Sequence, residues 1–527
     1  MATTVKTGKE ILSEFFDNFD IEYVFGNPGT TETTFLDVVS QKDNCKFILG
    51  LHESTATGIA VGYAAKSGRP SVVNIHTYPG LANAMSVLYN AYTVGIPLLV
   101  IAGQQNRNHL IHHPILSGNL TGLASSASVS QYQIDHISDM STILQRSYLD
   151  ADEAKAPAFI SIPMDIYQDQ TTISHFKPTK APCPTVAVNL EPAAELIRNE
   201  KGGIVIVADA EAAWSDGLSK SLRLLSEGLH ADVYLAPFSL RSMVDIRSPN
   251  YRGVLPAVSS EANETLSRYG TVVLLGEKIQ SFLFMNKPTI PDQLVLIQFS
   301  NGNTRLRYDY SFDLVVRGDI ASNLSRLCSI INLPTAVLAD KKQACRKNPS
   351  LLVNLLECIA RDTPIVIEGS SHQSVEEAIT TELEFDDIYY EPRGGALGMA
   401  MPMAVGISLY SKKHSVCLLG DGGSMYSIHS IWTAAHYKIP VIFICIVNNE
   451  YQILKQLWKL QVPESDEKRY KPIMDIKSPE LDLHKIASGF GARVQHATGD
   501  NFRQILNDAM QYEGPTFITI TDDHRYA

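Results

Sequence analysis

The sequence predicts an α/β protein with three doubly wound parallel sheets, and two observations carry that prediction. Continuous apolar runs recur along the chain, as in 97–105, 202–210 and 415–423. Such runs are typical of strands buried on both faces, because helices cover both sides of a parallel sheet. Helix-like segments, 79–94 and 425–438 among them, lie between the runs. This alternation favours α/β units joined by right-handed crossovers.

Eight apolar runs are predicted to be strands, and each ends in a small or polar residue. In chain order they are PLLVIAGQQ (97–105), PAFISIPMD (157–165), GGIVIVADA (202–210), TVVLLGE (271–277), TPIVIEGSS (363–371), SVCLLGDGG (415–423), PVIFICIVNNE (440–450) and PTFITITDD (515–523). Open parallel sheets bind their ligands at the carboxyl ends of the strands. The polar residues that end these runs are therefore candidates for a functional site.

Two linker-like segments divide the chain into three parts of similar size. The first linker, 176–185, is rich in proline, and the second, 331–350, combines charge with proline. They separate the expected domains 1–177, 188–332 and 348–527. Three α/β units of matched length agree with the length prior of roughly 150 residues per domain.

The composition excludes several classes of protein. Hydrophobic residues make up 45% of the 527 residues, enough for packed cores and too many for a disordered chain. The net charge of −12 argues against nonspecific binding to nucleic acid or to an anionic membrane. No apolar stretch reaches the roughly 18 residues of a membrane span, and the N-terminus has no apolar signal core. The seven cysteines include no C-x-x-C pair, so we expect free thiols and a cytoplasmic protein.

Two polar clusters follow neighbouring expected strands and predict a site for Mg²⁺ and phosphate. The first is Gly-Asp-Gly-Gly at 420–423, and the second is Asn-Asn-Glu at 448–450. A carboxylate, an amide oxygen and a backbone carbonyl form a hard oxygen site that leaves room for phosphate oxygens. Glycines let backbone N–H groups approach those phosphates at the start of a helix. A simple turn in which Asp421 caps a helix is the alternative, and the second cluster argues against it.

With these clusters in place, the sequence resembles the thiamine-diphosphate-dependent 2-oxo acid decarboxylase and acetolactate synthase superfamily over nearly its whole length. The two clusters match that superfamily's cofactor signature. Segments that resemble the benzoylformate decarboxylase branch are VFGNPGTTE (24–32), NIH (74–76), AGQQ (102–105), GGALG (394–398) and YSIHSIWTAAHYKIP (426–440). The resemblance implies a pyrimidine-binding domain (1–177), a central domain (188–332) and a diphosphate- and Mg-binding domain (348–527).

The resemblance implies thiamine diphosphate and Mg²⁺ as cofactors. The side chains of Asp421 and Asn448 and the carbonyl of Glu450 would hold Mg²⁺. Gly395 would offer its carbonyl to the exocyclic amine of the aminopyrimidine, and Leu397 would support the bend of the cofactor, although it also fits a core leucine. The expected thiamine diphosphate contacts are Gly29, Glu53, Ser370, Ser371, Gly395, Leu397, Gly422, Gly423, Ser424 and Tyr451. The usual G-D-G-S is G-D-G-G here, with the serine one place later.

Glu53, His76 and Thr30 are the expected catalytic residues. By resemblance, Glu53 binds the N1′ nitrogen of the aminopyrimidine. On its own it fits a carboxylate that a helix dipole favours. His76 ends the expected strand 71–76 and would transfer protons near neutral pH, although a structural hydrogen bond is the alternative. Thr30 stands where the decarboxylases have serine, and its hydroxyl could hold a substrate carboxylate.

The expected substrate pocket departs from the decarboxylase pattern in the central domain. Its residues are Thr30, His76, Leu283, Leu454 and Leu457. Leu283 falls near the place of a second catalytic histidine, and no histidine lies between 231 and 371. The helix that carries Leu454 and Leu457, with Ile453 and Trp458, would roof the pocket or simply pack its apolar face. His112 and His113 are either alternative proton donors or surface loop residues.

We therefore expect nonoxidative decarboxylation of a 2-oxo acid with an apolar or aromatic side chain. A carboligase or aldehyde lyase that forms or cleaves 2-hydroxyketones is the alternative, which the missing histidine favours. A catalytically weak subunit that binds cofactor is a third hypothesis, and the intact cofactor residues argue against it. The sequence leaves a bound flavin open, although the central domain has no G-x-G-x-x-G motif.

The resemblance also implies partners. The small-molecule partner is a 2-oxo acid or an aldehyde. The macromolecular partner is a second copy of the chain, in a homodimer or homotetramer with sites between chains. Glu53 of one chain would then face Asp421 of the other. The helix at 54–66, which is rich in alanine and glycine, is the expected contact between the chains.

Overall fold

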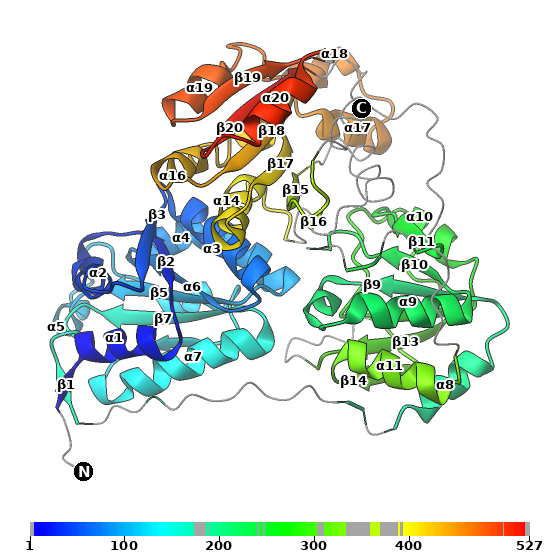
Figure 1. Cartoon of the computed structure of the whole chain (residues 1–527), viewed down its shortest axis with the longest axis horizontal. Coiled ribbons are helices and arrows are strands. Elements are labelled where there is room, and N and C mark those ends of the chain that lie inside the picture. Colours follow the sequence, from blue (N-terminus) through cyan, green and yellow to red (C-terminus); the bar gives the residue numbers. More distant parts are fainter. Residues whose placement is uncertain are drawn as a thin grey trace. The chain divides into compact units, whose positions relative to one another are not determined.

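The computed structural model forms two compact units. Unit 1 combines 1–180, 363–371 and 394–526, and unit 2 combines 181–362 and 372–393 with the final residue. The residues that the structure describes are 5–172, 176, 186–187, 189–239, 241, 243–245, 248–302, 310–333, 359–368, 388–389, 394–498 and 500–521. Figure 1 shows the helices and strands of both units.

Unit 1 contains a six-stranded sheet near the N-terminus with strand order β3-β2-β4-β5-β7-β6. Its strands, all in parallel pairs, are β2 (Tyr23–Asn27), β3 (Lys46–Leu49), β4 (Ser71–Ile75), β5 (Leu98–Gln104), β6 (Gln131–Gln133) and β7 (Pro157–Pro163). The short strands β1 (Lys6–Thr7) and β8 (Gln170–Thr171) form an antiparallel pair beside it. The helices are α1 (Gly8–Asn18), α2 (Thr33–Ser40), α3 (Glu53–Ser67), α4 (Thr77–Val94), α5 (Arg107–Leu110), α6 (Leu120–Ala124) and α7 (Met140–Ala154).

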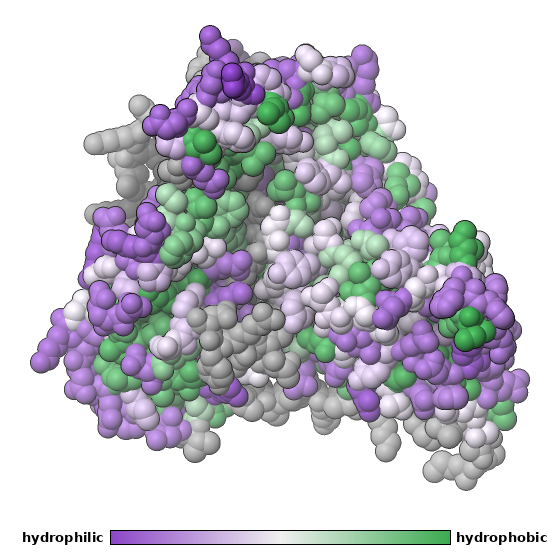
Figure 2. All heavy atoms as spheres, turned by 180° about the vertical axis from the view of Figure 1, so that it is seen from behind, coloured by the Kyte–Doolittle hydropathy of each residue, from purple (hydrophilic) through white to green (hydrophobic). Residues whose placement is uncertain are grey.

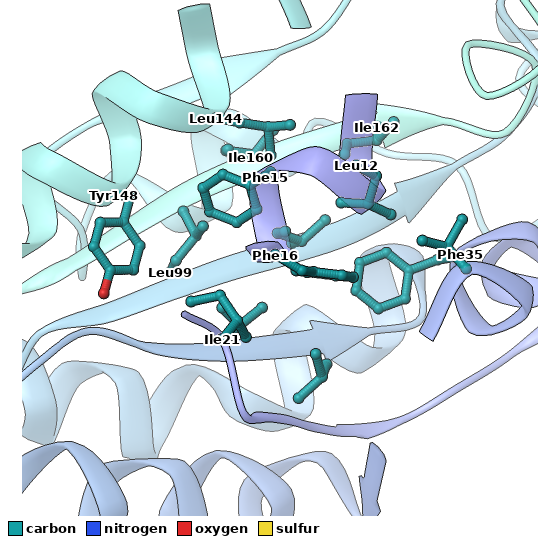
Figure 3. Close-up of a cluster of buried hydrophobic side chains, with 14 of the residues drawn as sticks. Leu12, Phe15, Phe16, Ile21, Phe35, Leu99, Leu144, Tyr148, Ile160 and Ile162 are labelled. Atoms are coloured by element: carbon teal, nitrogen blue, oxygen red, sulfur yellow. The ribbon is translucent and has the colours of Figure 1, made fainter. Parts of the chain in front are cut away.

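The core of this region lies between α1, α7 and the sheet (Figure 3). Phe15 and Phe16 of α1 are almost fully buried, and Phe15 lies edge-on to Tyr148 of α7 with ring centroids 6.0 Å apart. A capping box starts α1, because Thr7 accepts from the Glu10 N–H while Glu10 accepts from the Thr7 N–H. The capping box fixes the start of α1, and the buried aromatic rings hold α1 and α7 on one face of the sheet.

Unit 2 contains a second six-stranded sheet, in the order β11-β10-β9-β12-β13-β14, and all its pairs are parallel. The strands are β9 (Ile204–Ala208), β10 (Asp232–Leu235), β11 (Tyr251–Val254), β12 (Thr271–Leu275), β13 (Val295–Ser300) and β14 (Leu314–Arg317). The helices are α8 (Glu191–Arg198), α9 (Leu218–Leu229), α10 (Ser259–Leu266) and α11 (Ile320–Ile330). Both faces of β9 and β12 are buried, as the continuous apolar runs predicted.

A third six-stranded sheet has the order β16-β15-β17-β18-β20-β19. Its strands are β15 (Ile365–Glu368), β16 (Ile388–Tyr389), β17 (Ser415–Gly420), β18 (Val441–Val447), β19 (Arg493–Ala497) and β20 (Thr516–Thr521). The helices are α14 (Ala400–Ser411), α15 (Asp421–Ser424), α16 (Ser430–His436), α17 (Gln452–Gln461), α18 (Glu467–Tyr470), α19 (Leu483–Gly489) and α20 (Phe502–Ala509). The three parallel sheets confirm the predicted fold class. All eight predicted strands are present, whereas the domain boundaries remain a prediction.

Helix α3 packs against α14 of the same chain, with their backbones in close contact. A Cβ atom on Gly62 would lie 2.0 Å from the carbonyl oxygen of Met403, and one on Gly406 would lie 1.9 Å from that of Ile59. The small residues of α3 therefore serve a contact within the chain, between regions far apart in the sequence. The prediction that 54–66 forms the contact between chains is wrong, because nearly all of this helix is already buried.

The surface mixes polar and apolar residues (Figure 2), and the described cysteines are free thiols, as expected from the sequence. Hydrophilic and hydrophobic residues are interspersed over the face seen in Figure 2. Within the described ranges, no helix is both long and apolar enough to cross a membrane. Cys45, Cys417 and Cys445 are buried free thiols, and Cys328 is a half-buried one.

Candidate functional site

The two predicted polar clusters meet at the carboxyl edge of the third sheet. In the parallel pair of β17 and β18, Gly420 is in register with Ile446, so the residues that follow each strand lie side by side. The Asp421 carboxylate accepts the Gly422 N–H on Oδ1 at 2.7 Å and the Asn448 N–H on Oδ2 at 3.1 Å. Because Oδ2 also accepts the Asn449 N–H at 2.5 Å, Asp421 does more than cap its own short helix.

The Asp421 carboxylate fits a divalent cation. Its side chain is buried, and burial raises the pKa of this carboxyl although hydrogen bonds from backbone N–H groups lower it. The amide oxygen of Asn448 faces the same loop, where it accepts the Glu450 N–H at 3.1 Å. Among the residues that the structure describes, no three His, Cys, Asp or Glu side chains form a metal cluster. The available donor set is thus one carboxylate with neutral oxygens, which suits Mg²⁺.

The glycines of the first cluster are in close contact with side chains. The ring of Tyr451 packs on Gly422, where a Cβ atom would lie 2.8 Å from Cε1. A Cβ atom on Gly423 would lie 2.9 Å from a carboxylate oxygen of Glu368. Ser424 is fully buried, and its hydroxyl donates to the Asp421 carbonyl at 2.7 Å. This hydroxyl thus has a partner within the chain.

The loop that carries Gly395 and Leu397 lies on the surface of unit 1. Gly395 has a φ of +71°, a left-handed conformation that glycine adopts without strain. Leu397 is 37% exposed, so the alternative that it is a core leucine is wrong. Ser370 and Ser371, the other expected diphosphate contacts, lie outside the described residues.

Glu53 is the first residue of α3 and is held by two side-chain amides. Its Oε2 accepts from Asn83 at 3.0 Å, and its Oε1 accepts from Asn27 at 3.4 Å. A Cβ atom on Gly80 would lie 3.3 Å from Oε1, so α4 approaches the carboxylate closely. Only 8% of Glu53 is exposed. The carboxylate is therefore fixed in direction and largely shielded from water.

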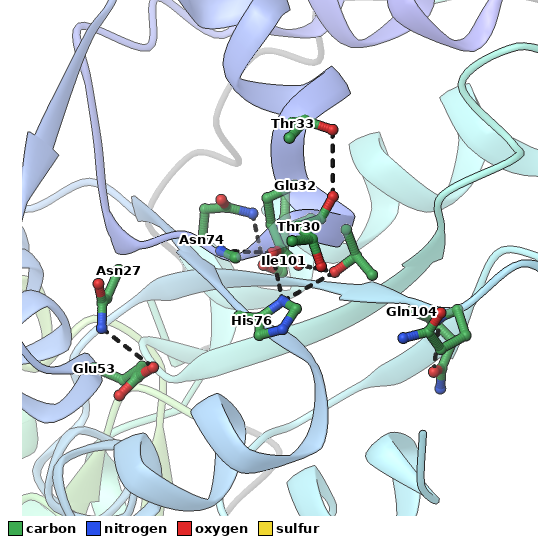
Figure 4. A network of polar contacts seen from close by, with 12 residues as sticks. Asn27, Thr30, Glu32, Thr33, Glu53, Asn74, His76, Ile101 and Gln104 are labelled. Carbon is green, nitrogen blue, oxygen red and sulfur yellow. Dashed lines mark hydrogen bonds and ion pairs between the residues drawn. The ribbon is translucent and has the colours of Figure 1, made fainter. Parts of the chain in front are cut away.

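His76 forms an ion pair with Glu32, a residue that the sequence did not single out (Figure 4). His76 Nδ1 lies 2.8 Å from Glu32 Oε2 and 3.1 Å from the Thr31 hydroxyl. Glu32 is buried, and it also accepts the Thr31 hydroxyl and the Gly29 N–H. The hydrogen bond to Glu32 raises the pKa of His76, and burial opposes that shift. The bond also fixes the tautomer, because Nδ1 must carry a proton to donate to the carboxylate.

Strand order brings these residues together. β2 and β4 are neighbours, with Asn27 in register with Ile75. The turn after β2 therefore lies beside His76, and a Cβ atom on Gly29 would lie 2.1 Å from the His76 ring. Thr30 is exposed at the start of this turn, whereas the hydroxyl of its neighbour Thr31 contacts His76. Thr30 as a substrate contact remains a prediction.

Helix α17, which follows the Asn-Asn-Glu cluster, exposes Leu454. Leu454 of α17 is 46% exposed, whereas Lys455 beside it is 9% exposed. Lys455 pairs with Glu450 at 2.6 Å and with Asp475. Because Trp458 of this helix stacks on Tyr470, part of its apolar face packs within the chain, and both alternatives stay open. Leu457 is half-buried, and both leucines remain candidates for the pocket.

The remaining candidates are Leu283 of unit 2 and two histidines of unit 1. Leu283 is in unit 2, after β12, where its carbonyl accepts the Ser259 N–H at 2.9 Å. His112 and His113 are exposed in the loop after α5, as the alternative that they are surface loop residues predicts. A signal for Glu32 was present in the sequence, because a Glu three residues after Gly29 is placed like the last residue of a capping box. No comparable signal pointed to Glu368 or Lys455.

Family models match three regions of the chain. They are the N-terminal thiamine pyrophosphate (TPP) binding domain at residues 6–122, the central domain of thiamine pyrophosphate enzymes at 190–327 and their C-terminal TPP binding domain at 383–520. Together they cover most of the three sheets and leave β6, β7 and β15 outside the matched ranges.

Two curated relatives match almost the full length. Benzoylformate decarboxylase of Pseudomonas aeruginosa is 28% identical, and the match covers 98% of this chain and 99% of the relative. A putative acetolactate synthase large subunit of Mycobacterium tuberculosis is 24% identical over 97% of this chain and 98% of the relative.

Two solved structures share the architecture. The thiamine diphosphate-dependent 4-hydroxybenzoylformate decarboxylase of Rhodococcus jostii superposes with a TM-score of 0.85 at 25% identity, over 98% of this chain and 99% of that one. Benzoylformate decarboxylase of Polynucleobacter necessarius superposes with a TM-score of 0.86 at 25% identity, over 98% of both chains.

Proposed function

Because the chain belongs to the thiamine pyrophosphate enzyme family, we propose that it removes CO₂ from a 2-oxo acid with an apolar or aromatic side chain, and that Mg²⁺ accompanies its thiamine diphosphate. The pairing of His76 with the buried carboxylate of Glu32 is the observation that carries this proposal. A raised pKa keeps His76 protonated nearer to neutral pH. A cationic imidazole can attract a substrate carboxylate and then donate the proton that the aldehyde product requires.

Thiamine diphosphate, when bound, supplies the electron sink for cleavage of the bond to the carboxylate. Glu53 would bind the ring nitrogen of the aminopyrimidine, and the amides of Asn27 and Asn83 keep its carboxylate in one orientation. Asp421 and Asn448, with the Glu450 carbonyl, would hold Mg²⁺ against the diphosphate. Leu454 and Leu457 of α17 would exclude water from an apolar substrate side chain.

Product analysis tests this function. The purified protein, loaded with thiamine diphosphate and Mg²⁺, is given a panel of 2-oxo acids with aryl, branched and small side chains. We expect release of CO₂ and aldehyde, fastest with the aryl and branched acids. Glu53→Gln is the matched variant, because it keeps the shape and one oxygen acceptor, and it should lower turnover by about 10²–10⁴-fold. Absence of CO₂ from every acid would overturn the proposal.

Carboligation is the second candidate, and one observation favours it. No histidine lies between 231 and 371, so the segment around Leu283 offers no second imidazole for product protonation. Slower protonation would leave time for an aldehyde acceptor to react. The ratio of 2-hydroxyketone to aldehyde, measured with added acetaldehyde or benzaldehyde, separates the two functions. A majority of hydroxyketone at low acceptor concentration would make carboligation the main activity.

A further inference from the structure

The loop at 394–400 contains two left-handed glycines and one exposed leucine. Gly395 has a φ of +71° and Gly398 a φ of +82°. Leu397 between them is 37% exposed, so packing within the chain does not determine where its side chain points. The direction of Leu397 therefore depends strongly on its backbone, and two buried polar side chains bind that backbone.

Asn90 of α4 binds the first half of the loop. Its side chain is fully buried. Its Nδ2 donates to the Ala396 carbonyl at 2.9 Å, and its Oδ1 accepts the Ala396 N–H at 3.2 Å. A Cβ atom on Gly394 would lie 2.1 Å from Asn90 Oδ1, so this residue must be glycine. One side-chain amide thus pairs with both polar groups of a single residue.

This pairing determines the direction of the Gly395 carbonyl. The Ala396 N–H and the Gly395 C=O belong to the same peptide plane, in which they point in opposite directions. Because Asn90 accepts that N–H, the Gly395 carbonyl points away from Asn90. It is thereby kept available for a ligand, and this is the carbonyl expected to meet the exocyclic amine of the aminopyrimidine.

Glu368, the last residue of β15, binds the second half of the loop. Its Oε1 accepts the Gly398 N–H at 2.8 Å, and its Oε2 accepts the Ala400 N–H at 2.9 Å. Only 5% of Glu368 is exposed. The Gly398 N–H shares a peptide plane with the Leu397 carbonyl, so this bond fixes the peptide that follows Leu397. The carboxylate also lies against Gly423 of the diphosphate cluster.

We propose that Asn90 and Glu368 are positioning residues that together orient Gly395 and Leu397 toward the cofactor. Asn90 fixes the two peptides on either side of Ala396, and Glu368 fixes the peptide after Leu397. Both planes next to Leu397 are then set, and with them the direction of its side chain. The inference rests on the proposed function, because it assigns the loop at 394–400 to the aminopyrimidine half of the cofactor.

The test separates the two halves of thiamine diphosphate. The variants are Asn90→Asp, which keeps the size and the acceptor but loses the donor, and Glu368→Gln, which turns one acceptor into a donor. Asn90→Ser is a neutral second variant, in case a buried charge prevents folding. The controls in unit 2 are Asn323→Asp and Glu211→Gln, which change equally buried groups. Calorimetry at saturating Mg²⁺ measures the affinity for thiamine diphosphate and for inorganic diphosphate, and NMR after acid quench measures C2–H exchange of saturated cofactor.

We expect the Asn90 and Glu368 variants to lower the C2–H exchange rate by about 10- to 100-fold at saturating cofactor, because small displacements of an orienting group carry costs of this order. They should weaken binding of thiamine diphosphate and leave binding of inorganic diphosphate unchanged. The control variants should change neither. Wild-type exchange in the variants would overturn the inference. Equal weakening of both ligands would also overturn it, because the residues would then act on the diphosphate site or the fold. If the unmodified protein exchanges C2–H slowly, the proposed function fails instead.

Discussion

Glu32 gives His76, a histidine that follows a strand end, a buried ionic partner. Its carboxylate is buried and fully used, since it pairs with His76 and accepts the Thr31 hydroxyl and the Gly29 N–H. The negative charges that raise the pKa of His76 are those of Glu32 and, to a smaller extent, Glu53.

The pH dependence of activity should therefore depend on Glu32. Because the pKa of His76 is raised in the folded chain, the pair stabilises the protein below the pKa of a free histidine, and this contribution is lost as pH rises through the raised value. Glu32→Gln should move the alkaline limb of kcat/KM to lower pH. NMR titration of His76 checks the same shift directly. If the NMR titration of His76 shifts in Glu32→Gln but the alkaline limb of kcat/KM does not, His76 is not the proton donor.

At the scale of elements, the carboxyl ends of β17 and β18 carry the loops proposed to hold Mg²⁺. Asp421 accepts three backbone N–H groups from both loops, so it organises them in addition to its proposed role as a ligand. Asp421→Ala should reduce the affinity for thiamine diphosphate at least about 100-fold, since even groups that only support metal ligands contribute 10–100-fold. Calorimetry with and without Mg²⁺ measures this.

A comparison with Asp421→Asn distinguishes the two roles. Asparagine keeps one oxygen acceptor and the shape, but it loses the charge that a divalent cation needs. It should preserve the melting temperature better than Asp421→Ala and still lose most of the Mg²⁺ dependence. Retention of wild-type Mg²⁺ dependence in Asp421→Asn would refute the metal site.

The crossing of α3 and α14 places two helix backbones in direct contact. Gly62→Ala would place a methyl group 2.0 Å from the Met403 carbonyl oxygen. The two helices would have to move apart to make room for it. We expect a loss of about 1–3 kcal/mol in the free energy of unfolding, measured with denaturant. Gly489→Ala is the control, because nothing lies within 4 Å of its Cβ position. It should be neutral or slightly stabilising, since alanine favours a helix more than glycine does. Equal effects of both substitutions would contradict this account.

At the scale of the whole molecule, we propose that the protein acts as a homodimer or homotetramer. The correction for α3 removes one expected contact between chains, and the proposal now rests on the family alone. Light scattering combined with activity at serial dilution tests it. We expect a mass of at least two chains, and activity that falls when dilution separates them. An active monomer would contradict shared sites.

The sequence alone determined the class of fold, the eight strands of the apolar runs and the place of the two polar clusters. Continuous apolar runs reflect burial on both faces of a strand, which is a local property of the chain. The polar residues at strand ends reach one edge because all the strands are parallel. Asp421 and Asn448 could therefore be placed together before their geometry was known.

Tertiary structure alone decided what depends on neighbours far apart in the sequence. Glu32 meets His76 because β2 lies beside β4, and Asn90 meets Ala396 because α4 approaches a loop some 300 residues later. The same holds for α3, whose small residues fit either a partner chain or α14. Local patterns report how buried a residue is, but they do not identify the surface that buries it. That choice is made by strand order and helix packing, which few local signals encode.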